Sequence, residues 1–521
     1  MPPAIAKRLI IGFGSESGNA RALARQLAAL PGLQSFGPQA LPLNEVSLAG
    51  WDAQDVLVIL SSSFGDGEPP ANAEGFLASV QQAQALPGLR YALFGLGDTG
   101  YPQFCGFTKK LDGALQQRGA QPLLHRVDAD AGYPAFFAQW APVLQAVLQG
   151  QPHAGQDLKL QVKAYGEDNA YAARILECRQ LNQGAPGAFH VRLASEGSGM
   201  HWRAGDTLHV LPENDPALLD AIAQWYGEPA AADLLRHKEL RQISKTVLRE
   251  LARASGHERL KTLLKFSQRK ELEAYLWGAD LLDLLQDFCT PAQLPLAELA
   301  ELLSPRLPRA YSIASHGQAG HLDLCIREVQ HERQGRQRYG MATRWLRASP
   351  PAVKVYCRSN PGFHLPADAQ APLLLIGTGT GIAPLMGLLR EMQHSGQQRK
   401  TCLIFGEKQR ACDFLYEDEL TALHQQGQLS TLITAFSRDG QSKYYVQHAI
   451  ADHALHIRQL LTDGAHIYLC GNKAHLEDAI AQAINALDEA SQTDAEADTQ
   501  TQTQTLWQRL QAQGRLHQEL Y

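Results

Sequence analysis

A glycine- and hydroxyl-rich loop, GSESGNA, joins a short apolar run to a helical pattern near the start of the chain. Ser15, Ser17 and Asn19 carry short polar side chains, and Gly18 lets the backbone turn so that several N–H groups converge. Such a nest at a helix N-terminus suits a phosphate. No Gly-Lys-Ser/Thr string follows, so a nucleoside triphosphatase loop is disfavoured. An ordinary capped helix start is the alternative interpretation.

Two further loops, SSSFGDGEPP and FGLGDTGYPQFC, follow the next two apolar runs. Their glycines permit close approach to a flat ring, and Phe64 and Tyr101 can stack on its faces. Backbone groups of Gly65, Leu96 and Gly97 can reach the heteroatoms of that ring. A single tyrosine in a loop usually has no binding role, but three loops in register at one sheet edge are a more specific signal of a binding site.

The string RAYSIAS places a cation, an aromatic ring and a hydroxyl on one predicted strand. Arg309 can form a bidentate contact with a pyrophosphate, Tyr311 can pack against a flat ring, and Ser312 can hydrogen-bond to that ring. A plain amphipathic strand is the structural alternative.

The string SRD and the later KYYVQ follow the predicted strand TLITAFS. Ser437, Arg438 and Lys443 can bind a 2′-phosphate, with Tyr445 against an adenine and Gln447 beside it. Sites for NAD instead place an acid on the ribose hydroxyl. The pattern therefore favours NADPH over NADH, whereas SRD in isolation is typical of a surface turn.

Strands and helices that alternate along the chain must position these loops. Apolar runs at Arg8–Phe13, Asp55–Ser61 and Arg90–Gly95 are separated by helical patterns, which predicts a parallel doubly wound sheet. Ligands bind at the carboxyl ends of strands in such sheets, where the first three loops lie. From Pro372 a second α/β pattern begins with LLLIG, TCLIFG, TLITAFS and HIYLCG.

At 521 residues the chain is too long for one hydrophobic core, so we expect a multidomain α/β protein. Residues 1–149 form the first predicted domain, and 150–158 (GQPHAGQDL) a linker. Residues 159–368 form a second domain that is helical at about 212–303. Residues 369–521 form the third.

Composition narrows the classes of function. A net charge of −6 without a basic stripe argues against nucleic acid as a partner. The eight cysteines are scattered without a CxxC pair, which predicts reduced thiols and no metal site. No apolar run approaches the ~20 residues that span a bilayer, and the N-terminus lacks a secretory pattern. We therefore expect a cytoplasmic protein without a membrane anchor.

The three N-terminal loops resemble those of the flavodoxin-like domain of the diflavin reductases, which include cytochrome P450 reductase, nitric oxide synthase reductase and sulfite reductase flavoprotein. The resemblance implies that the ligand is FMN and that the segment HRVDADAGY supplies a fourth edge of the binding site. The FMN-binding residues that it implies are Ser15, Glu16, Ser17, Gly18, Asn19, Ala20, Ser62, Ser63, Phe64, Gly65, Leu96, Gly97, Asp98, Tyr101, Phe104, Cys105 and Asp128.

Acidic residues are frequent in these loops. Acids near the ring edge would disfavour a doubly reduced, anionic flavin and orient a basic acceptor surface. The alternative is that these acids form only a solvent-exposed rim with no role in tuning the flavin or orienting an acceptor. The acids are Asp66, Glu68, Glu74, Asp98, Asp128 and Asp130.

The strings RAYSIAS and GMAT resemble the FAD motifs of the ferredoxin-NADP reductase family, to which the second half of diflavin reductases belongs. The resemblance implies an FAD-binding β-barrel with a helical connecting insertion, and Ser312 near the flavin N5. Many members have Tyr at the position of His331. The implied FAD-binding residues are Arg309, Ala310, Tyr311, Ser312, Gly340, Met341, Ala342 and Thr343.

The loop GTGTGIAP resembles the nicotinamide-pyrophosphate loop of the same family and implies binding by Gly379 and Thr380. Thr378 stands where many members have Pro. The string CGN matches the loop that places a Cys, here Cys470, beside the nicotinamide, and Asn472 replaces a frequent Asp. A buried inert thiol is the alternative for Cys470 alone.

The chain ends in LHQELY, and in this family the last aromatic ring lies over the FAD. By resemblance Tyr521 covers the flavin and must move for hydride transfer, although chain ends are usually frayed. Glu519 stands where relatives have Asp and is a candidate partner for Ser312 and Cys470. These four residues are the predicted catalytic set.

Within the family, bacterial sulfite reductase flavoprotein shares the strings GNAR, GEPP, LGDT, RVDAD, DFLY and GAHIY with this chain. The resemblance implies electron flow from NADPH to FAD, to FMN and to a protein acceptor, the sirohaem subunit of sulfite reductase. The leading extension linked to oligomer assembly is missing, so the oligomeric state stays open. Two alternatives also stay open: a stand-alone reductase for a haem oxygenase, P450 or iron-reducing partner, and a silent flavin-binding scaffold.

Overall fold

The computed structural model describes residues 8–15, 18–52, 54–63, 67–98, 103–130, 133–151, 153–155, 158–162, 165–333, 335–492 and 504–521. The chain forms two compact units. The first comprises Met1–Gly166, Gly197–Trp202 and Cys357–Ser359, and the second comprises Glu167–Glu196, Arg203–Tyr356 and Asn360–Tyr521.

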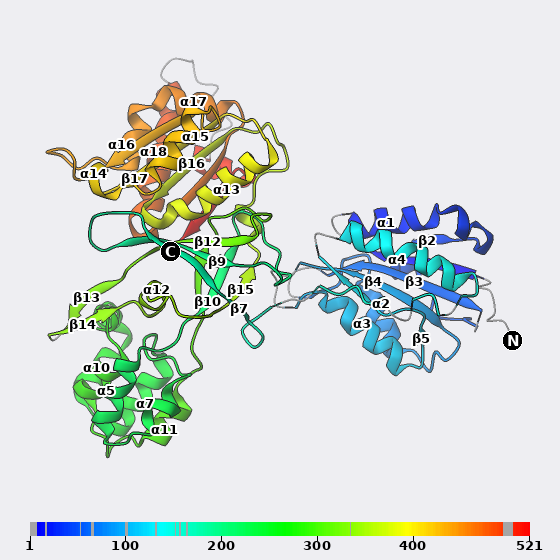
Figure 1. Ribbon diagram of the computed structural model, residues 1–521, viewed down its shortest axis with the longest axis horizontal. Helices are drawn as coiled ribbons and strands as arrows, with labels where there is room; N and C mark the ends of the chain where they lie inside the picture. Colours follow the sequence, from blue (N-terminus) through cyan, green and yellow to red (C-terminus); the bar gives the residue numbers. More distant parts are fainter. Residues whose placement is uncertain are drawn as a thin grey trace. The chain divides into compact units, whose positions relative to one another are not determined.

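A parallel sheet with helices on both faces forms the body of the first unit (Figure 1). Its strand order is β2-β1-β3-β4-β5, and β6 also pairs with β4. The strands are β1 (Arg8–Gly14), β2 (Gln39–Pro42), β3 (Asp55–Ser62), β4 (Arg90–Leu96), β5 (Gln121–Pro122) and β6 (Val127–Ala129). The helices are α1 (Asn19–Ala28), α2 (Glu74–Gln82), α3 (Gly106–Gln117) and α4 (Tyr133–Leu148), with short 3-10 turns at Pro31–Phe36 and Leu43–Glu45.

Alternation along the strands builds a separate core on each face of this sheet. On β3, Val56, Val58 and Leu60 pack with residues of α1 and α4. The intervening Leu57 and Ile59 pack with residues of α2 and α3. Because successive side chains of a strand point to opposite faces, a continuous apolar run is what a sheet covered on both sides requires.

The chain beyond α4 continues to pack against the first unit. Leu160 is buried in its core, and Gln161 forms a parallel bridge with Asp128 of β6. The Asp128 amide donates to the Leu160 carbonyl at 3.0 Å, and the Val162 amide donates to the Asp128 carbonyl at 2.9 Å. The segment 158–162 therefore lies with the first unit, although the sequence placed the start of the next domain at residue 159.

Two small antiparallel sheets and a hairpin open the second unit. One sheet has the order β11-β10-β15-β7, the other has β12-β9-β8, and β13 pairs with β14. The strands are β7 (Tyr171–Ala173), β8 (Ile175–Gln180), β9 (Ala188–Ala194), β10 (Thr207–Leu211), β11 (Arg309–Ser312), β12 (His321–Arg327), β13 (Gln330–Arg333), β14 (Arg336–Tyr339) and β15 (Val353–Arg358). Helix α12 (Met341–Arg347) follows β14, and a 3-10 turn (Pro361–Phe363) follows β15.

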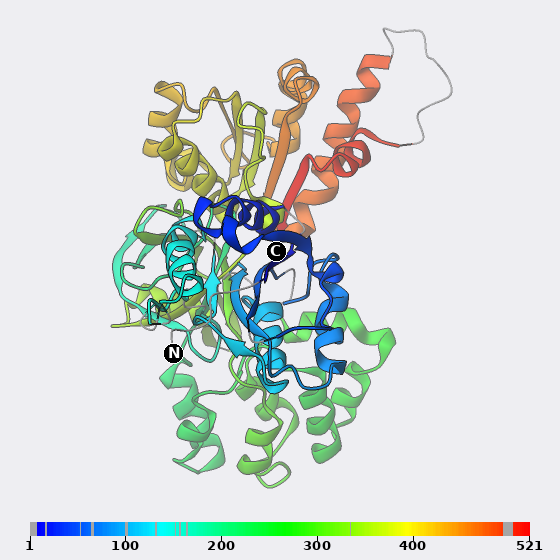
Figure 2. The same ribbon diagram turned by 90° about the vertical axis from the view of Figure 1, so that its right-hand side faces the viewer.

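Helices fill the long segment between β10 and β11, and they gather as one group (Figure 2). Leucines from these helices share one buried core, which explains why the segment is rich in Leu. The helices are α5 (Pro216–Tyr226), α6 (Ala231–Leu235), α7 (Lys245–Ser255), α8 (Glu258–Leu263), α9 (Arg269–Leu276), α10 (Leu281–Phe288) and α11 (Leu296–Leu302), with a 3-10 turn at Phe266–Gln268.

A second parallel sheet, of order β18-β17-β16-β19-β20, completes the chain. Leu373 and Leu375 of β16 pack on the face that carries α13 and α15, and Leu374 and Ile376 pack on the opposite face. The strands are β16 (Leu373–Thr378), β17 (Thr401–Glu407), β18 (Thr431–Phe436), β19 (His466–Gly471) and β20 (Leu516–Leu520). The helices are α13 (Ile382–Ser395), α14 (Arg410–Asp413), α15 (Glu417–Gln425), α16 (Val446–Asp452), α17 (Ala454–Thr462), α18 (Lys473–Gln492) and α19 (Leu506–Ala512), and a 3-10 turn (Gly379–Gly381) precedes α13.

Candidate functional site

The last strand of the chain places its terminal side chains at the carboxyl end of the C-terminal sheet. Strand β20 runs parallel to β19, and Cys470 is the register partner of Glu519. The Tyr521 amide donates to the Gly471 carbonyl at 3.1 Å, and the Lys473 amide donates to the Tyr521 carbonyl at 3.0 Å. The final residue is therefore held by the backbone, in contrast to the frayed end that is usual for a chain terminus.

A three-residue hydrogen-bonded cluster surrounds the Glu519 carboxylate. The Ser312 hydroxyl, at the end of β11, donates to its Oε1. The Asn360 amide Nδ2 donates to its Oε2 at 3.3 Å, while the Asn360 backbone N–H donates to Asp206 at 2.9 Å. The structure thus brings together Ser312, Cys470 and Glu519, as the sequence predicted. Asn360 belongs to no motif that the sequence singled out.

Burial governs the protonation of this cluster. It raises the pKa of Glu519 to about 7, although the hydrogen bonds from Ser312 and Asn360 act in the opposite direction. Burial also raises the pKa of the Cys470 thiol far above its usual value, and the neighbouring Glu519 adds to this effect. Cys470 is therefore a neutral thiol at physiological pH, and Glu519 is able to exchange a proton near neutrality.

A cavity of about 710 Å³ lies beside this cluster, at the carboxyl ends of β16 and β17. Tyr521 lines it and is 60% exposed as a residue, and its hydroxyl is 3.0 Å from the Thr380 hydroxyl. Six residues that the sequence assigned to nicotinamide or flavin binding line this one cavity: Gly379, Thr380, Ser437, Tyr445, Gln447 and Tyr521.

Two cations predicted for the 2′-phosphate stand apart from this lining. Arg438 and Lys443 are exposed and do not line the cavity. The Arg438 backbone N–H donates to the Lys408 carbonyl at 2.8 Å, which fixes the backbone of the turn next to Ser437. The two side chains are available on the same turn that carries Ser437.

The residues predicted to bind FAD occupy two places in the second unit. Arg309, Ala310, Tyr311 and Ser312 lie on β11, which pairs with β10. Gly340 precedes α12, and Met341, Ala342 and Thr343 form its first turn. Gly340 and Met341 line a cavity of about 140 Å³ together with the cations Arg241 and Arg344.

The Arg309 guanidinium is engaged within the protein. Its Nη2 lies 3.1 Å from the carboxylate of Glu239, and its Nη1 donates to the Leu307 carbonyl at 2.7 Å. Glu239 itself is only 1% exposed. Backbone hydrogen bonds and Arg309 hold the pKa of Glu239 below its usual value, although burial opposes them. A bound pyrophosphate would have to share Arg309 with this buried carboxylate.

Loops from three strands converge at one edge of the first unit. The Ser63 amide donates to the Leu96 carbonyl at 2.8 Å, and the Gly97 amide donates to the Ala129 carbonyl at 2.8 Å. Ser62 ends β3, and Asp98, Phe104 and Cys105 lie on the loop between β4 and α3, so the structure brings these predicted residues together. Glu16, Ser17, Phe64, Gly65 and Tyr101 lie outside the described residues.

The loop after β1 carries an orphaned polar atom. The Ser15 hydroxyl is buried and has no hydrogen-bond partner among the described residues, and its backbone N–H donates to Asn72 at 2.9 Å. Gly18, with φ of +88°, precedes α1, whose first residues are Asn19 and Ala20. An unsatisfied buried hydroxyl beside a helix N-terminus fits a phosphate ligand.

Two acids of the predicted rim are buried. Asp128 accepts hydrogen bonds from Arg126 at 2.8 and 3.0 Å, and its side chain is only 7% exposed. Asp130 is buried as well. Glu68 and Glu74 are exposed, and Asp66 lies outside the described residues. The acidic rim is therefore smaller than the sequence indicated, because Asp128 forms an ion pair instead of facing solvent.

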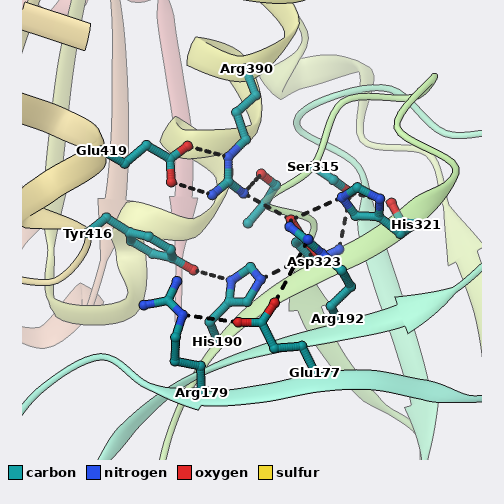
Figure 3. Close-up of polar contacts among 11 residues, drawn as sticks. Glu177, Arg179, His190, Arg192, Ser315, His321, Asp323, Arg390, Tyr416 and Glu419 are labelled. Carbon is teal, nitrogen blue, oxygen red and sulfur yellow. Dashed lines mark hydrogen bonds and ion pairs between the residues drawn. The ribbon is translucent and has the colours of Figure 1, made fainter. Parts of the chain in front are cut away.

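A buried ionic network around Asp323 connects the small sheets to the C-terminal sheet (Figure 3). Arg192 of β9 and Arg390 of α13 approach the Asp323 carboxylate at 2.7 and 3.2 Å. Arg390 also pairs with Glu419 of α15 at 2.7 Å. Hydrogen bonds from His190 and Arg192 hold the pKa of Asp323 well below its usual range, although burial opposes them. The sequence did not predict this network, because its members lie on separate elements.

No helix in the described part of the chain is both long and apolar enough to cross a membrane. Within the same residues, no group of three or more His, Cys, Asp or Glu side chains is arranged to hold a metal ion. All eight cysteines are free, and Cys105, Cys325, Cys357, Cys402 and Cys470 are buried.

Known proteins share both halves of this architecture. Residues 11–140 match the flavodoxin family, and residues 375–482 match the oxidoreductase NAD-binding domain family. Sulfite reductase (NADPH) flavoprotein alpha-component of Bacillus subtilis is 31% identical over 95% of this chain and 87% of its own length. The protein of the same description from Photobacterium profundum is 31% identical over 94% and 86%, and that from Neisseria meningitidis is 30% identical over 92% and 85%.

These matches cover both parallel sheets and the segment between them. A flavodoxin-like sheet followed by an NAD-binding sheet defines a flavoprotein reductase that uses a nicotinamide cofactor. The chain belongs to the diflavin reductase family.

Proposed function

We propose that this chain is the NADPH-oxidising flavoprotein that supplies electrons to a sulfite reductase haemoprotein. The observation that carries the proposal is the cavity of about 710 Å³, in which the predicted nicotinamide residues and Tyr521 meet beside Ser312, Cys470 and Glu519. When bound, NADPH supplies a hydride and the two flavins release the electrons singly.

The first unit is proposed to hold FMN. The orphaned Ser15 hydroxyl and the φ of Gly18 fit a phosphate, and the loops after β3 and β4 offer backbone groups for a flat ring. Ser62, Ser63, Gly97 and Asp98 would contact this ligand. Residues 1–149 are the proposed FMN domain, and 150–158 the linker.

The two small sheets of the second unit are proposed to form an FAD-binding barrel, connected through the helices α5–α11. The cavity next to Gly340 is lined by Arg241 and Arg344 together with Glu213 and Asp215, and the two guanidinium groups are those that would contact an anionic diphosphate. Tyr311 and Ser312 would face the ring. The residues after 162 and up to 368 are the proposed FAD domain, and 369–521 the proposed NADPH domain.

The larger cavity is proposed to bind NADPH. Ser437 would contact the 2′-phosphate within it, and the exposed Arg438 and Lys443 would close on that group from the same turn. Tyr445 and Gln447 would lie against the adenine. The cluster of Ser437, Arg438 and Lys443, which offers a hydroxyl and two cations to a 2′-phosphate, supports NADPH over NADH.

Side chains of the protein control access to this site and the protonation of its groups. Tyr521 occupies part of the cavity and must leave it before a nicotinamide reaches the flavin. The Ser312 hydroxyl donates to Glu519, and the neutral Cys470 thiol is carried by the register partner of Glu519, whose carboxyl would exchange a proton near neutral pH. Together, Ser312, Cys470 and Glu519 would orient the reacting groups and stabilise the charge that develops on them.

Reconstitution with a sirohaem sulfite reductase subunit tests the function. The purified chain and that subunit are mixed with NADPH, and sulfite-dependent NADPH loss is measured. A rate that saturates with the haemoprotein supports the proposal. If ferricyanide is reduced while sulfite causes no additional NADPH loss, the acceptor is a different haem or iron protein.

A further inference from the structure

An acid and a base that belong to no recognised motif face the large cavity. Arg327 ends β12, Glu407 ends β17, and both line the cavity with Gly379 and Thr380. The Arg327 Nη2 forms a hydrogen-bonded ion pair with Glu407 Oε1. The pair is therefore part of the wall that a dinucleotide would contact.

Glu407 is an unusual residue for a cavity that takes a polyanion. Its side chain is only 5% exposed, and its Oε2 accepts a hydrogen bond from the Lys408 N–H at 2.7 Å. Burial raises its pKa, while Arg327 opposes that rise. A buried carboxylate without a counter-ion would repel phosphates, so the neighbouring guanidinium is required for the cavity to accept them.

The pair lies beside the turn that precedes α13. A Cβ atom added to Gly379, whose φ is +56°, would lie 3.4 Å from Glu407 Oε1. Because the Arg327 Nη2 contacts this same oxygen, the guanidinium lies near the Gly379–Gly381 turn. The turn is the segment to which the diphosphate of a dinucleotide is assigned in the proposed function.

Arg327 has unused capacity for hydrogen bonding. Its Nη1 contacts the Pro186 carbonyl at 3.4 Å and its Nη2 contacts Glu407, whereas no described residue accepts a hydrogen bond from its Nε. Its side chain is 19% exposed, so one edge of the guanidinium faces the cavity. A guanidinium group that the protein holds at one edge, and that can donate hydrogen bonds from another edge, is suited to bind a phosphate.

We propose that Arg327 binds the diphosphate of the nicotinamide dinucleotide and that Glu407 is the positioning residue that holds its guanidinium for this contact. The inference rests on the proposed function, since it takes NADPH as the ligand of the cavity. It assigns the diphosphate to Arg327, and leaves the 2′-phosphate to Ser437, Arg438 and Lys443.

Binding measurements on the full chain with both flavins test the assignment. Dissociation constants are measured by calorimetry for NADP⁺ and for adenosine 2′-monophosphate, which has the 2′-phosphate but no diphosphate. Arg327→Ala should weaken NADP⁺ binding about tenfold or more, the usual loss for a charge-assisted hydrogen bond, and change adenosine 2′-monophosphate binding less than about twofold.

Arg327→Ala leaves a buried carboxylate unpaired, so a second comparison guards against misfolding. Arg327→Ala combined with Glu407→Gln should bind NADP⁺ more weakly than Glu407→Gln alone, but the loss should be smaller than the roughly tenfold loss in Arg327→Ala, because Glu407 no longer holds the guanidinium. Arg347→Ala is the matched control, because Arg347 pairs with Glu328 at 2.5 Å outside the cavity lining. That variant should bind both ligands as the unmodified protein does.

Equal weakening of both ligands in the Arg327 variants, or NADP⁺ binding within about twofold of the unmodified protein, would overturn the assignment. The proposed function fails in a different way: the unmodified protein would then bind neither NADP⁺ nor adenosine 2′-monophosphate.

Discussion

The Ser312 hydroxyl donates a hydrogen bond to the Glu519 carboxylate across 207 positions of sequence. The pairing of β19 with β20 fixes Glu519 opposite Cys470, and this register brings the Glu519 carboxylate within hydrogen-bonding reach of Ser312. Strand β20 thus delivers a half-buried acid to a strand of the small antiparallel sheet. Glu519 is the residue on which the proton chemistry of the site depends.

Replacing Glu519 with Gln should remove a titration near pH 7 from the rate of flavin reduction by NADPH. Burial raises the pKa of this carboxyl to about 7, so its protonation changes within the assay range. Asn360→Leu should move the same midpoint to higher pH, because the lost hydrogen bond favours the ionised form. Anaerobic stopped-flow bleaching across neutral pH measures both. An unchanged pH profile in the Gln variant would contradict this role.

Glu519 also links stability to pH. Because its pKa is raised in the fold, its contribution to stability is complete below the usual value of 4.5 and is lost as pH rises through about 7. Glu519→Gln should therefore gain stability relative to the unmodified protein as pH rises through this window, by about 3 kcal/mol. Melting temperatures of the two proteins at matched pH values measure this difference. A constant difference across the window would argue against a carboxyl that titrates there.

Tyr521→Ala should tighten NADP⁺ binding about tenfold. The ring lines the cavity and bonds Thr380, so a ligand no longer has to displace it. The substitution keeps the backbone hydrogen bonds of the last residue with Gly471 and Lys473. Calorimetric titration with NADP⁺ checks this, and weaker binding in the Ala variant would refute the gating role.

Gly18→Ala should reduce the FMN content of the purified protein and leave FAD unchanged. The φ of +88° costs a side chain about 1–2 kcal/mol, which would distort the phosphate loop. Gly119→Ala is a matched control, because Gly119 has the same φ of +88° and a Cβ there would meet only ordinary contacts. Flavin analysis after extraction gives the ratio. Equal FMN loss in both variants would indicate general unfolding instead of a local site.

Arg438→Met should raise the KM for NADPH about tenfold while kcat and the KM for NADH stay constant. The predicted contact is to the 2′-phosphate, which NADH lacks. Arg253→Met is the control, since Arg253 pairs with Glu250 in the helical segment. Steady-state ferricyanide reduction with each nicotinamide measures these constants. Equal losses with both cofactors would remove Arg438 from the 2′-phosphate site.

Both parallel sheets were predictable from the sequence because their strands are continuous apolar runs. Strands β1, β3 and β4 lie within a residue of the predicted Arg8–Phe13, Asp55–Ser61 and Arg90–Gly95. Strand β2 was not predicted, because QALP is short and contains proline. Strand β20 is half-buried and polar, so LHQEL shows no apolar run, and only the resemblance pointed to its residues.

The residues of the site were predictable from the sequence only where they belong to a recognisable motif. Ser312, Cys470 and Glu519 come from recognisable strings, and the structure places them together. Arg327 and Glu407 come from two different sheets, and their pairing depends on how the ends of β12 and β17 meet at the Gly379–Gly381 turn. No local pattern encodes such a contact, because each residue alone resembles an ordinary strand end.

Quantitative flavin extraction from the freshly purified chain tests the central claim most directly. One polypeptide is proposed to hold two different flavins, and the account predicts one FMN and one FAD per chain. A preparation that contains a single kind of flavin after supplementation with both would contradict it.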